Sequence, residues 1–150
     1  MFDAFGEFDT VEELNLAADG QRSQGDNEAL KTLALENGIE LDYVQAFIDG
    51  AIIDLATPMT AAIGKLDIEL KSESSPDLKA SMEAMGKYLQ AHCTEESLAR
   101  AIRKKGKRLS EVMMEIRNEA EKRITRRSGT VIITIPPAEV YQMLRQYYMR

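Results

Sequence analysis

Only one pair of neighbouring side chains in this sequence combines a nucleophile with a base, His92 and Cys93. Adjacent residues on a helix point about 100° apart, so these two side chains would not face each other. The chain has no second His and no second Cys that could complete a metal site or a catalytic relay. We therefore expect a helix-end histidine and a buried cysteine, with no catalytic residue, no metal and no cofactor.

Other catalytic signatures are missing as well. The carboxylates are plentiful but scattered, and no Glu/Asp pair stands beside an apolar segment as a glycosidase would need. The nine glycines stand singly, and neither the G-x-x-x-x-G-K-[ST] string nor the G-x-G-x-x-G string occurs. These observations predict a non-enzymatic protein that acts by binding a partner.

Basic side chains give the strongest local signal. Six fall within nine residues around the glycine at position 106, and four more stand at the end of the next expected helix. The helix dipole alone favours bases at helix C-termini, but such a patch can also bind phosphates or an acidic protein surface. The aromatic residues with which single-strand nucleic-acid binders stack bases are missing from both groups. The candidate partner-binding bases are Arg100, Arg103, Lys104, Lys105, Lys107, Arg108, Arg126 and Arg127.

The last expected helix adds two aromatic candidates, Tyr147 and Tyr148. With Val140 and Leu144 they follow helical spacing, which favours packing in the core. Tyrosine clusters near a terminus can also anchor an interface. We therefore include both tyrosines among the candidate partner-binding residues and keep core packing as the alternative.

The two halves of the chain carry opposite charge. Residues 1–75 have 16 acidic and 4 basic side chains, and residues 76–150 have 9 acidic and 15 basic ones, giving balances of −12 and +6. Two surfaces of opposite sign could steer different partners, or the halves could neutralise each other by packing together. Carboxylates on short helices can also imitate duplex phosphates and occupy a basic nucleic-acid channel, although an ordinary solvated acidic surface would look the same.

Capping signals and apolar spacing predict a mostly α-helical fold of one or more small helical domains, with at most one short strand or hairpin near the C-terminus. Thr10 and Glu13 have the spacing of a capping box, and Asp19-Gly20 is expected to end that helix. Thr57-Pro58 starts another helix, with the preceding 51–56 also expected to be helical. The remaining expected helices cover 27–36, 41–49, 76–92, 94–105, 110–124 and 137–148.

The β-branched run from Thr130 to Ile135 is the one convincing strand signal. A lone strand leaves its backbone groups unpaired. It could pair with residues 124–127 across Ser128-Gly129, pair with a strand from another chain, or serve as an extended connection.

The polar segment 71–76 is the clearest linker, and the charge balance changes sign there. We expect an acidic helical N-terminal subdomain over 1–70 and a basic helical C-terminal subdomain over 76–150. The first seven residues lack the basic start and apolar run of a signal peptide. No apolar stretch approaches the roughly 18–20 residues of a membrane span, so we expect a cytoplasmic protein without a membrane partner.

Several strings resemble the PcfK-like proteins of conjugative plasmids and integrative elements. The similar features are a helix ending near Leu89, the string SLARAIRKKGK over 97–107, and the helix 109–120. The closing EVYQMLRQYY over 139–148 and the opening MFDAFGEFD over 1–9 resemble the same family more loosely. The chain differs from the shorter members in its apolar run 131–135.

This resemblance implies a function, because some PcfK-like proteins are inhibitors of the type II CRISPR effector nuclease (anti-CRISPRs). It implies a stoichiometric inhibitor encoded by a phage or other mobile genetic element, with a CRISPR effector nuclease as its protein partner. The alternative is a conjugative-element accessory protein that binds DNA or a protein through its basic patch. A third possibility is a homo-oligomer assembled through the 130–135 strand or the tyrosine-rich helix.

Overall fold

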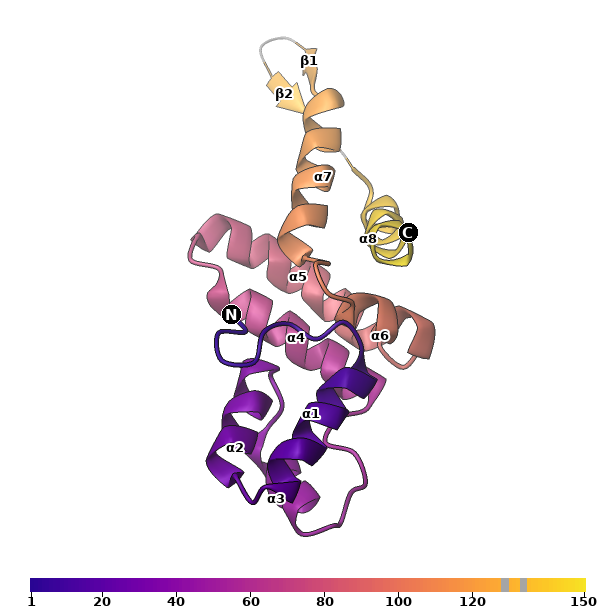
Figure 1. The fold of residues 1–150 in the computed structure, drawn as a ribbon. Helices are drawn as coiled ribbons and strands as arrows, with labels where there is room; N and C mark the ends of the chain where they lie inside the picture. The colour runs from indigo at the N-terminus through magenta and orange to yellow at the C-terminus, as the bar shows by residue number, and fades with distance from the viewer. Residues whose placement is uncertain (128–129, 133–134) are drawn as a thin grey trace.

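The structure, a computed structural model, describes residues 1–127, 130–132 and 135–150. Within these residues the chain is mostly helical with one short hairpin near the C-terminus, which confirms the predicted fold class (Figure 1). The elements are α1 (Val11–Ser23), α2 (Asn27–Glu36), α3 (Leu41–Ile48), α4 (Pro58–Ser72), α5 (Pro76–His92), α6 (Glu96–Arg103), α7 (Leu109–Lys122), β1 (Thr125–Arg127), β2 (Thr130–Ile132) and α8 (Pro137–Met149).

Helices α1, α2 and α3 form a small unit around their own apolar core. The Thr10 hydroxyl accepts a hydrogen bond from the Glu13 amide, and the Asp26 carboxylate accepts one from Ala29, so α1 and α2 both begin at satisfied caps. The fully buried side chains of this core include Leu14, Leu30, Leu33 and Phe47. We call residues 1–57 the acidic unit, because they carry 13 acidic and 2 basic side chains.

Helix α4 connects the acidic unit to the rest of the protein. Its first turn places Ala61 in the core of the acidic unit, while Ala62 and Leu66 belong to a second core formed with α5, α6, α7 and α8. Its main packing partners are α6 and α5. Of the expected linker 71–76, only residues 73–75 form the turn between α4 and α5, because α4 ends at Ser72 and α5 begins at Pro76. These helices pack against each other, so the two halves are in contact. The division into two subdomains stays a prediction.

Helix α1 does not end at Asp19-Gly20, as expected, but continues to Ser23. Arg22 explains the extension, because its guanidinium lies 3.9 Å from the centre of the Phe47 ring and donates to the Phe47 carbonyl. It also pairs with Asp19 one turn earlier. These contacts with α3 offset the cost of a glycine inside a helix, which is about 1 kcal/mol.

The segment 51–56 is not helical, which contradicts the expectation. It crosses from α3 to α4 as a series of bends. The Asn15 side chain accepts from the Ala56 amide at 2.9 Å and donates to its carbonyl at 2.8 Å, which holds the crossing against α1. Pro58 then requires Thr57 to be extended, so a helix could not run continuously into α4.

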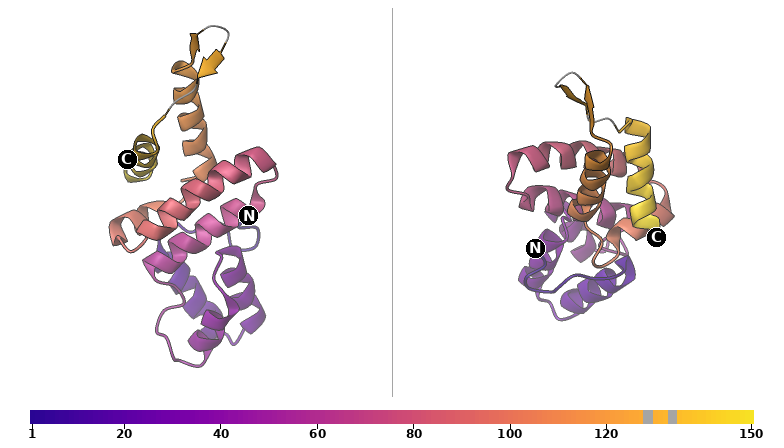
Figure 2. Two further views of the ribbon diagram at one scale, coloured as in Figure 1. Left: turned by 180° about the vertical axis from the view of Figure 1, so that it is seen from behind. Right: turned by 90° about the horizontal axis from the view of Figure 1, so that it is seen from above.

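Residues 125–127 and 130–132 pair as an antiparallel hairpin, with Arg126 opposite Val131. This is one of the three arrangements that the sequence allowed. The rest of the expected strand includes residues 133–134, which lie outside the described residues. The hairpin stands at the far end of α7, on the opposite side of α4 and α5 from the acidic unit (Figure 2). Of the helices in the described ranges, none has the length and apolarity needed to cross a bilayer.

Candidate functional site

The basic cluster expected to bind a partner lies at the end of α6 and in the turn that leads into α7. Arg100, at the start of this cluster, is already engaged by acidic residues of the chain. Its guanidinium is 2.6 Å from a Glu12 carboxylate oxygen and 2.9 Å from one of Glu96. The pairing with Glu12 joins α6 to α1, so part of the opposite charge of the two halves is neutralised inside the molecule.

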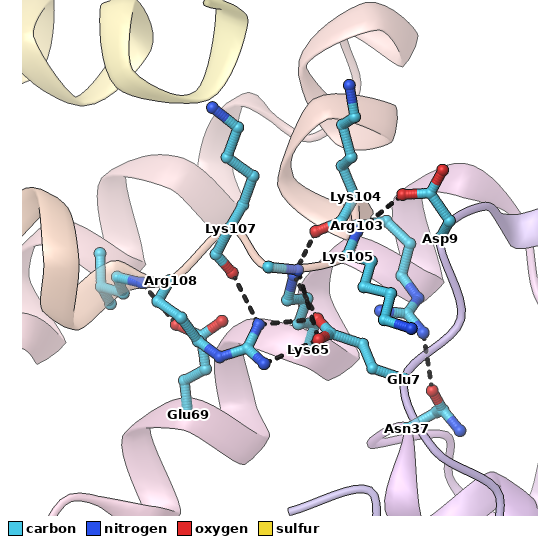
Figure 3. Close-up of polar contacts among 12 residues, drawn as sticks. Glu7, Asp9, Asn37, Lys65, Glu69, Arg103, Lys104, Lys105, Lys107 and Arg108 are labelled. Atoms are coloured by element: carbon cyan, nitrogen blue, oxygen red, sulfur yellow. Dashed lines mark hydrogen bonds and ion pairs between the residues drawn. The ribbon is translucent and has the colours of Figure 1, made fainter.

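Arg108 and Lys65 share one carboxylate from the N-terminal segment, that of Glu7 (Figure 3). The two terminal nitrogens of Arg108 each lie 2.7 Å from a Glu7 oxygen, and the Lys65 ammonium lies 3.0 Å from Glu7 Oε1. Lys65 also donates to the Lys104 carbonyl at 2.7 Å. Only 1% of the Lys65 side chain and 8% of the Glu7 side chain are exposed, so this is a buried ion pair.

The pKa values in this cluster follow from burial and pairing. Burial by itself would raise the pKa of Glu7, but hydrogen bonds from Arg108 and Lys65 outweigh it and hold the pKa at about 2. Burial lowers the pKa of Lys65, although Glu7 opposes the shift. We call Glu7, Lys65, Glu69, Arg103 and Arg108 the buried charge network.

Glu69 is the second carboxylate of the network. It accepts a hydrogen bond of 2.7 Å from the Leu109 amide and so satisfies the first turn of α7. Burial raises the pKa of Glu69 despite that bond. Glu69 therefore attaches α4 to the beginning of α7, the helix that carries the hairpin.

Arg103 is the most deeply buried of the candidate bases, with 1% of its surface exposed. It donates from Nη2 to the Asn37 side chain at 3.0 Å, and Nε and Nη1 have no acceptor within the described residues. Burial is the main cause that lowers its pKa. This placement makes Arg103 a link between α6 and the α2–α3 turn, away from the solvent-exposed surface.

We expect Arg103→Met to leave the free energy of unfolding within about 1 kcal/mol of the wild type, or to raise it, because an apolar side chain of similar length removes two unpaired buried donors. Arg103→Ala also removes the apolar stem and should lower it by about 2 to 3 kcal/mol. Urea unfolding of the three proteins tests this. A loss from Arg103→Met as large as that from Arg103→Ala would mean that the guanidinium, with its hydrogen bond to Asn37, stabilises the fold.

Lys107 is directed at the C-terminal end of α8, where its ammonium donates to the Tyr147 carbonyl at 2.8 Å. Lys104 and Lys105 are exposed, and neither ammonium has an ion-pair partner in the part of the chain that the structure describes. The Lys105 backbone amide does donate to Asp9. Arg126 and Arg127 belong to β1, and their side chains lie outside the described residues.

Tyr147 and Tyr148 lie in the core, with 3% and 2% of their surfaces exposed. The Tyr147 hydroxyl accepts from the Arg108 amide at 2.9 Å and donates to Glu111 at 2.6 Å. Burial raises the pKa of Tyr147 to about 12. Both rings therefore have the packing role that their helical spacing favoured, and Tyr147 holds α8 against the start of α7.

His92 and Cys93 do not form a pair. His92 Nδ1 lies 2.8 Å from the Tyr88 carbonyl, and Cys93 Sγ donates to the Leu89 carbonyl at 3.2 Å. Burial raises the pKa of the Cys93 thiol to about 11, so it is a thiol near neutral pH. The cysteine is buried, as expected.

The sequence-based reasoning missed Glu7, Lys65 and Glu69. One local signal was available, because Lys65 interrupts the apolar side of α4 directly beside Leu66. A lysine at such a position is rarely buried unless it is paired. The carboxylate that pairs with it comes from a segment nearly sixty residues earlier, and no spacing rule connects the two.

The acidic unit presents most of its carboxylates to solvent. The unit itself holds only Arg22 and Lys31, which pair with Asp19 and Glu28, while Glu7 and Glu12 pair with bases outside it. The exposed acids on α2, α3 and the α3–α4 crossing are Asp26, Glu28, Glu40, Asp42, Asp49 and Asp54.

Across the described residues, no three His, Cys, Asp or Glu side chains gather closely enough to hold a metal ion. The arrangement thus offers two features for a partner, an exposed acidic unit and a small pair of free lysines. No protein-family model, no curated protein and no solved structure matches this chain, and the resemblance to PcfK-like proteins stays a prediction.

Proposed function

We propose that this chain is a non-enzymatic binding protein that stoichiometrically inhibits a type II CRISPR effector nuclease, with its acidic unit placed against the nuclease's basic nucleic-acid groove. The observation that carries the proposal is the distribution of charge. The acidic unit has 13 acidic and 2 basic side chains, and many of the carboxylates are exposed on three short helices. Such a surface attracts a positively charged channel and can occupy it in place of phosphates.

The state of the basic cluster supports the same assignment. Arg103 is buried and Arg108 is bound to Glu7, so these bases hold the molecule together. Arg103 cannot leave the core, and Arg108 cannot leave Glu7, without disrupting contacts that hold the fold together. The acidic unit is therefore the surface with more charge available for a partner.

The test is guide-directed DNA cleavage by a type II effector nuclease with increasing amounts of the purified protein, together with a pull-down of the nuclease with and without guide RNA. We expect cleavage to stop near equimolar protein. The combined variant Glu28→Lys, Asp49→Lys and Asp54→Lys should weaken retention by about tenfold or more, mainly through slower association. Unchanged cleavage at excess wild-type protein would refute the proposal.

Lys104→Glu with Lys105→Glu is the control for location, because it alters exposed charge outside the acidic unit. The inhibitor reading expects this variant to retain the nuclease as the wild type does. The same pair supports the second candidate function, a conjugative-element accessory protein that binds DNA, since both lysines are exposed. That function predicts a DNA gel shift that weakens steeply with salt and is lost in the lysine variant.

A further inference from the structure

A surface hollow lies where the α2–α3 turn and α3 of the acidic unit meet α4. Its volume is about 190 Å³, smaller than the roughly 300 to 1,000 Å³ of small-molecule sites, so it suits one side chain. Four of the residues that line it are apolar or aromatic, namely Ile39, Tyr43, Met59 and Ile63. Tyr43 and Met59 are 42% and 41% exposed, so the hollow has an apolar wall that is open to a partner.

The floor of this hollow is rigid because two backbones cross there without side chains between them. A Cβ atom on Gly38 would lie 2.2 Å from the Gly64 carbonyl oxygen, and one on Gly64 would lie 2.3 Å from that of Asn37. Gly38 also has a φ of +68°, which L side chains rarely adopt. The backbone positions at Gly38 and Gly64 are therefore set before any partner arrives.

Two carboxylates complete the hollow, Glu40 and Asp67, and no Lys or Arg lines it. Glu40 precedes α3 but makes no capping hydrogen bond with its side chain. Asp67 Oδ1 accepts a hydrogen bond of 2.7 Å from the Gln90 side-chain amide. Neither carboxylate has an ion-pair partner among the residues that the structure covers.

A second hollow gives a comparison for carboxylates that line a hollow without a lining base. It lies between α1 and the α3–α4 crossing, and its acids are Glu12, Asp19 and Asp54. Glu12 is paired with Arg100, which also lines that hollow, and Asp19 is paired with Arg22. The hollow at Gly38 and Gly64 differs because its negative charge is not offset by a lining base.

We propose that the hollow lined by Tyr43, Glu40 and Asp67 is the docking site for one arginine side chain of a protein partner. A guanidinium is planar, stacks on an aromatic face and donates up to five hydrogen bonds in a fixed fork. Tyr43 supplies the aromatic face, the two carboxylates supply acceptors, and Met59 and Ile63 match the apolar stem. A lysine ammonium would use the charge but not the planar geometry. Buried arginine and tyrosine residues are among the commonest energetic anchors of interfaces.

This inference deepens the proposed function, on which it rests for the identity of the partner. The chemistry itself is tested without the nuclease. The full ¹⁵N-labelled chain is titrated with N-acetyl-arginine methylamide, and the amide resonances of Gly38 and Gly64 are followed. We expect saturable shifts with the arginine compound, smaller ones with the lysine analogue, and none with the uncharged citrulline analogue. Equal shifts with citrulline would overturn the site.

Glu40→Gln with Asp67→Asn keeps the shape of the hollow and removes both charges. It should weaken arginine binding by at least about tenfold, since a hydrogen bond to a charged group contributes about 1.5–3 kcal/mol, and 1.4 kcal/mol is tenfold. Asp49→Asn with Asp54→Asn is the matched control, because it makes the same change in net charge at two exposed carboxylates that do not line the hollow and have no ion-pair partner among the described residues. Equal weakening by both pairs would show general charge attraction and overturn the inference.

A nuclease pull-down with Tyr43→Ala separates this inference from the proposed function. Retention at least about tenfold weaker than that of the wild type supports the arginine site. Full retention of the nuclease by both Tyr43→Ala and the Glu40/Asp67 variant overturns the arginine site and leaves the inhibitor function standing. If the wild type retains no nuclease, the proposed function fails, and the arginine titration still decides the chemistry of the hollow.

Discussion

Gly64→Ala is expected to lower the free energy of unfolding by about 3 kcal/mol, the upper end of ordinary overpacking. The added methyl would lie 2.3 Å from the Asn37 carbonyl oxygen and 2.9 Å from that of Gly38. These are backbone atoms, so the contact cannot be relieved by rotating a side chain. The α2–α3 turn would have to move away from α4. Thermal or urea unfolding measures the loss, which should appear as a decrease in Tm of about 6–12 °C.

Gly20→Ala is the control for this prediction. Gly20 lies inside α1, and a Cβ atom built there meets nothing within 4 Å. The same substitution should therefore raise the free energy of unfolding by about 0.5–1 kcal/mol, as expected when alanine replaces glycine in a helix. If the two variants had similar stabilities, the close backbone crossing would not exist in solution.

Glu7→Gln should destabilise the protein by about 3 kcal/mol at neutral pH, because it leaves the Lys65 ammonium buried without its carboxylate. Lys65 is 1% exposed, and Arg108 loses the same partner. Urea unfolding gives the difference from the wild type. Adding Lys65→Met to Glu7→Gln should recover much of the loss, since a buried ammonium is then replaced by an apolar side chain. If Lys65→Met recovered none of the lost stability, the unpaired Lys65 ammonium would not be the cause of the loss.

The difference between the wild type and Glu7→Gln should also depend on pH. The pKa of Glu7 is held at about 2, below its ordinary value of 4.5, so the unfolded state binds a proton more readily than the folded state. Its stabilisation is therefore fully present above about pH 4.5 and is lost as the pH falls towards 2. Glu69, whose pKa is raised, has the opposite dependence but is shared by both proteins. A difference that stayed constant down to about pH 3 would contradict the lowered pKa.

Local signals were sufficient for most helix boundaries. The Thr10 and Asp26 caps and the proline at 58 stand where a helix begins in the structure, and the glycine at 106 lies in the turn after α6, three residues past its end at Arg103. Each of these signals depends on atoms within four residues of it, so the boundary can be predicted from neighbouring residues in the sequence. The two wrong expectations, the end of α1 and the helix at 51–56, concern segments held by Arg22 and Asn15, which contact residues 25 and 41 positions away.

The sequence predicted which basic residues make up the candidate site, but not which of them are exposed to a partner. The sequence identified where the bases are, and it raised the possibility that the two halves neutralise each other. It could not distinguish Lys104, which is exposed, from Arg103, which is buried beside it. The two residues have the same neighbours in the sequence. Arg103 is buried because it lies on the side of α6 that packs against α4, and Lys104 does not.

By itself, the sequence determined that this protein is a small, mostly helical chain with one acidic and one basic half, because periodicity, caps and charge are local or additive properties. Only the tertiary structure decided which charges remain for a partner. Glu7 and Arg108 are 101 residues apart, and they pair because α4 brings the N-terminal segment to the start of α7. Because the Glu7 side chain is buried, that pair is costly to break, whereas the exposed carboxylates of the acidic unit stay solvated.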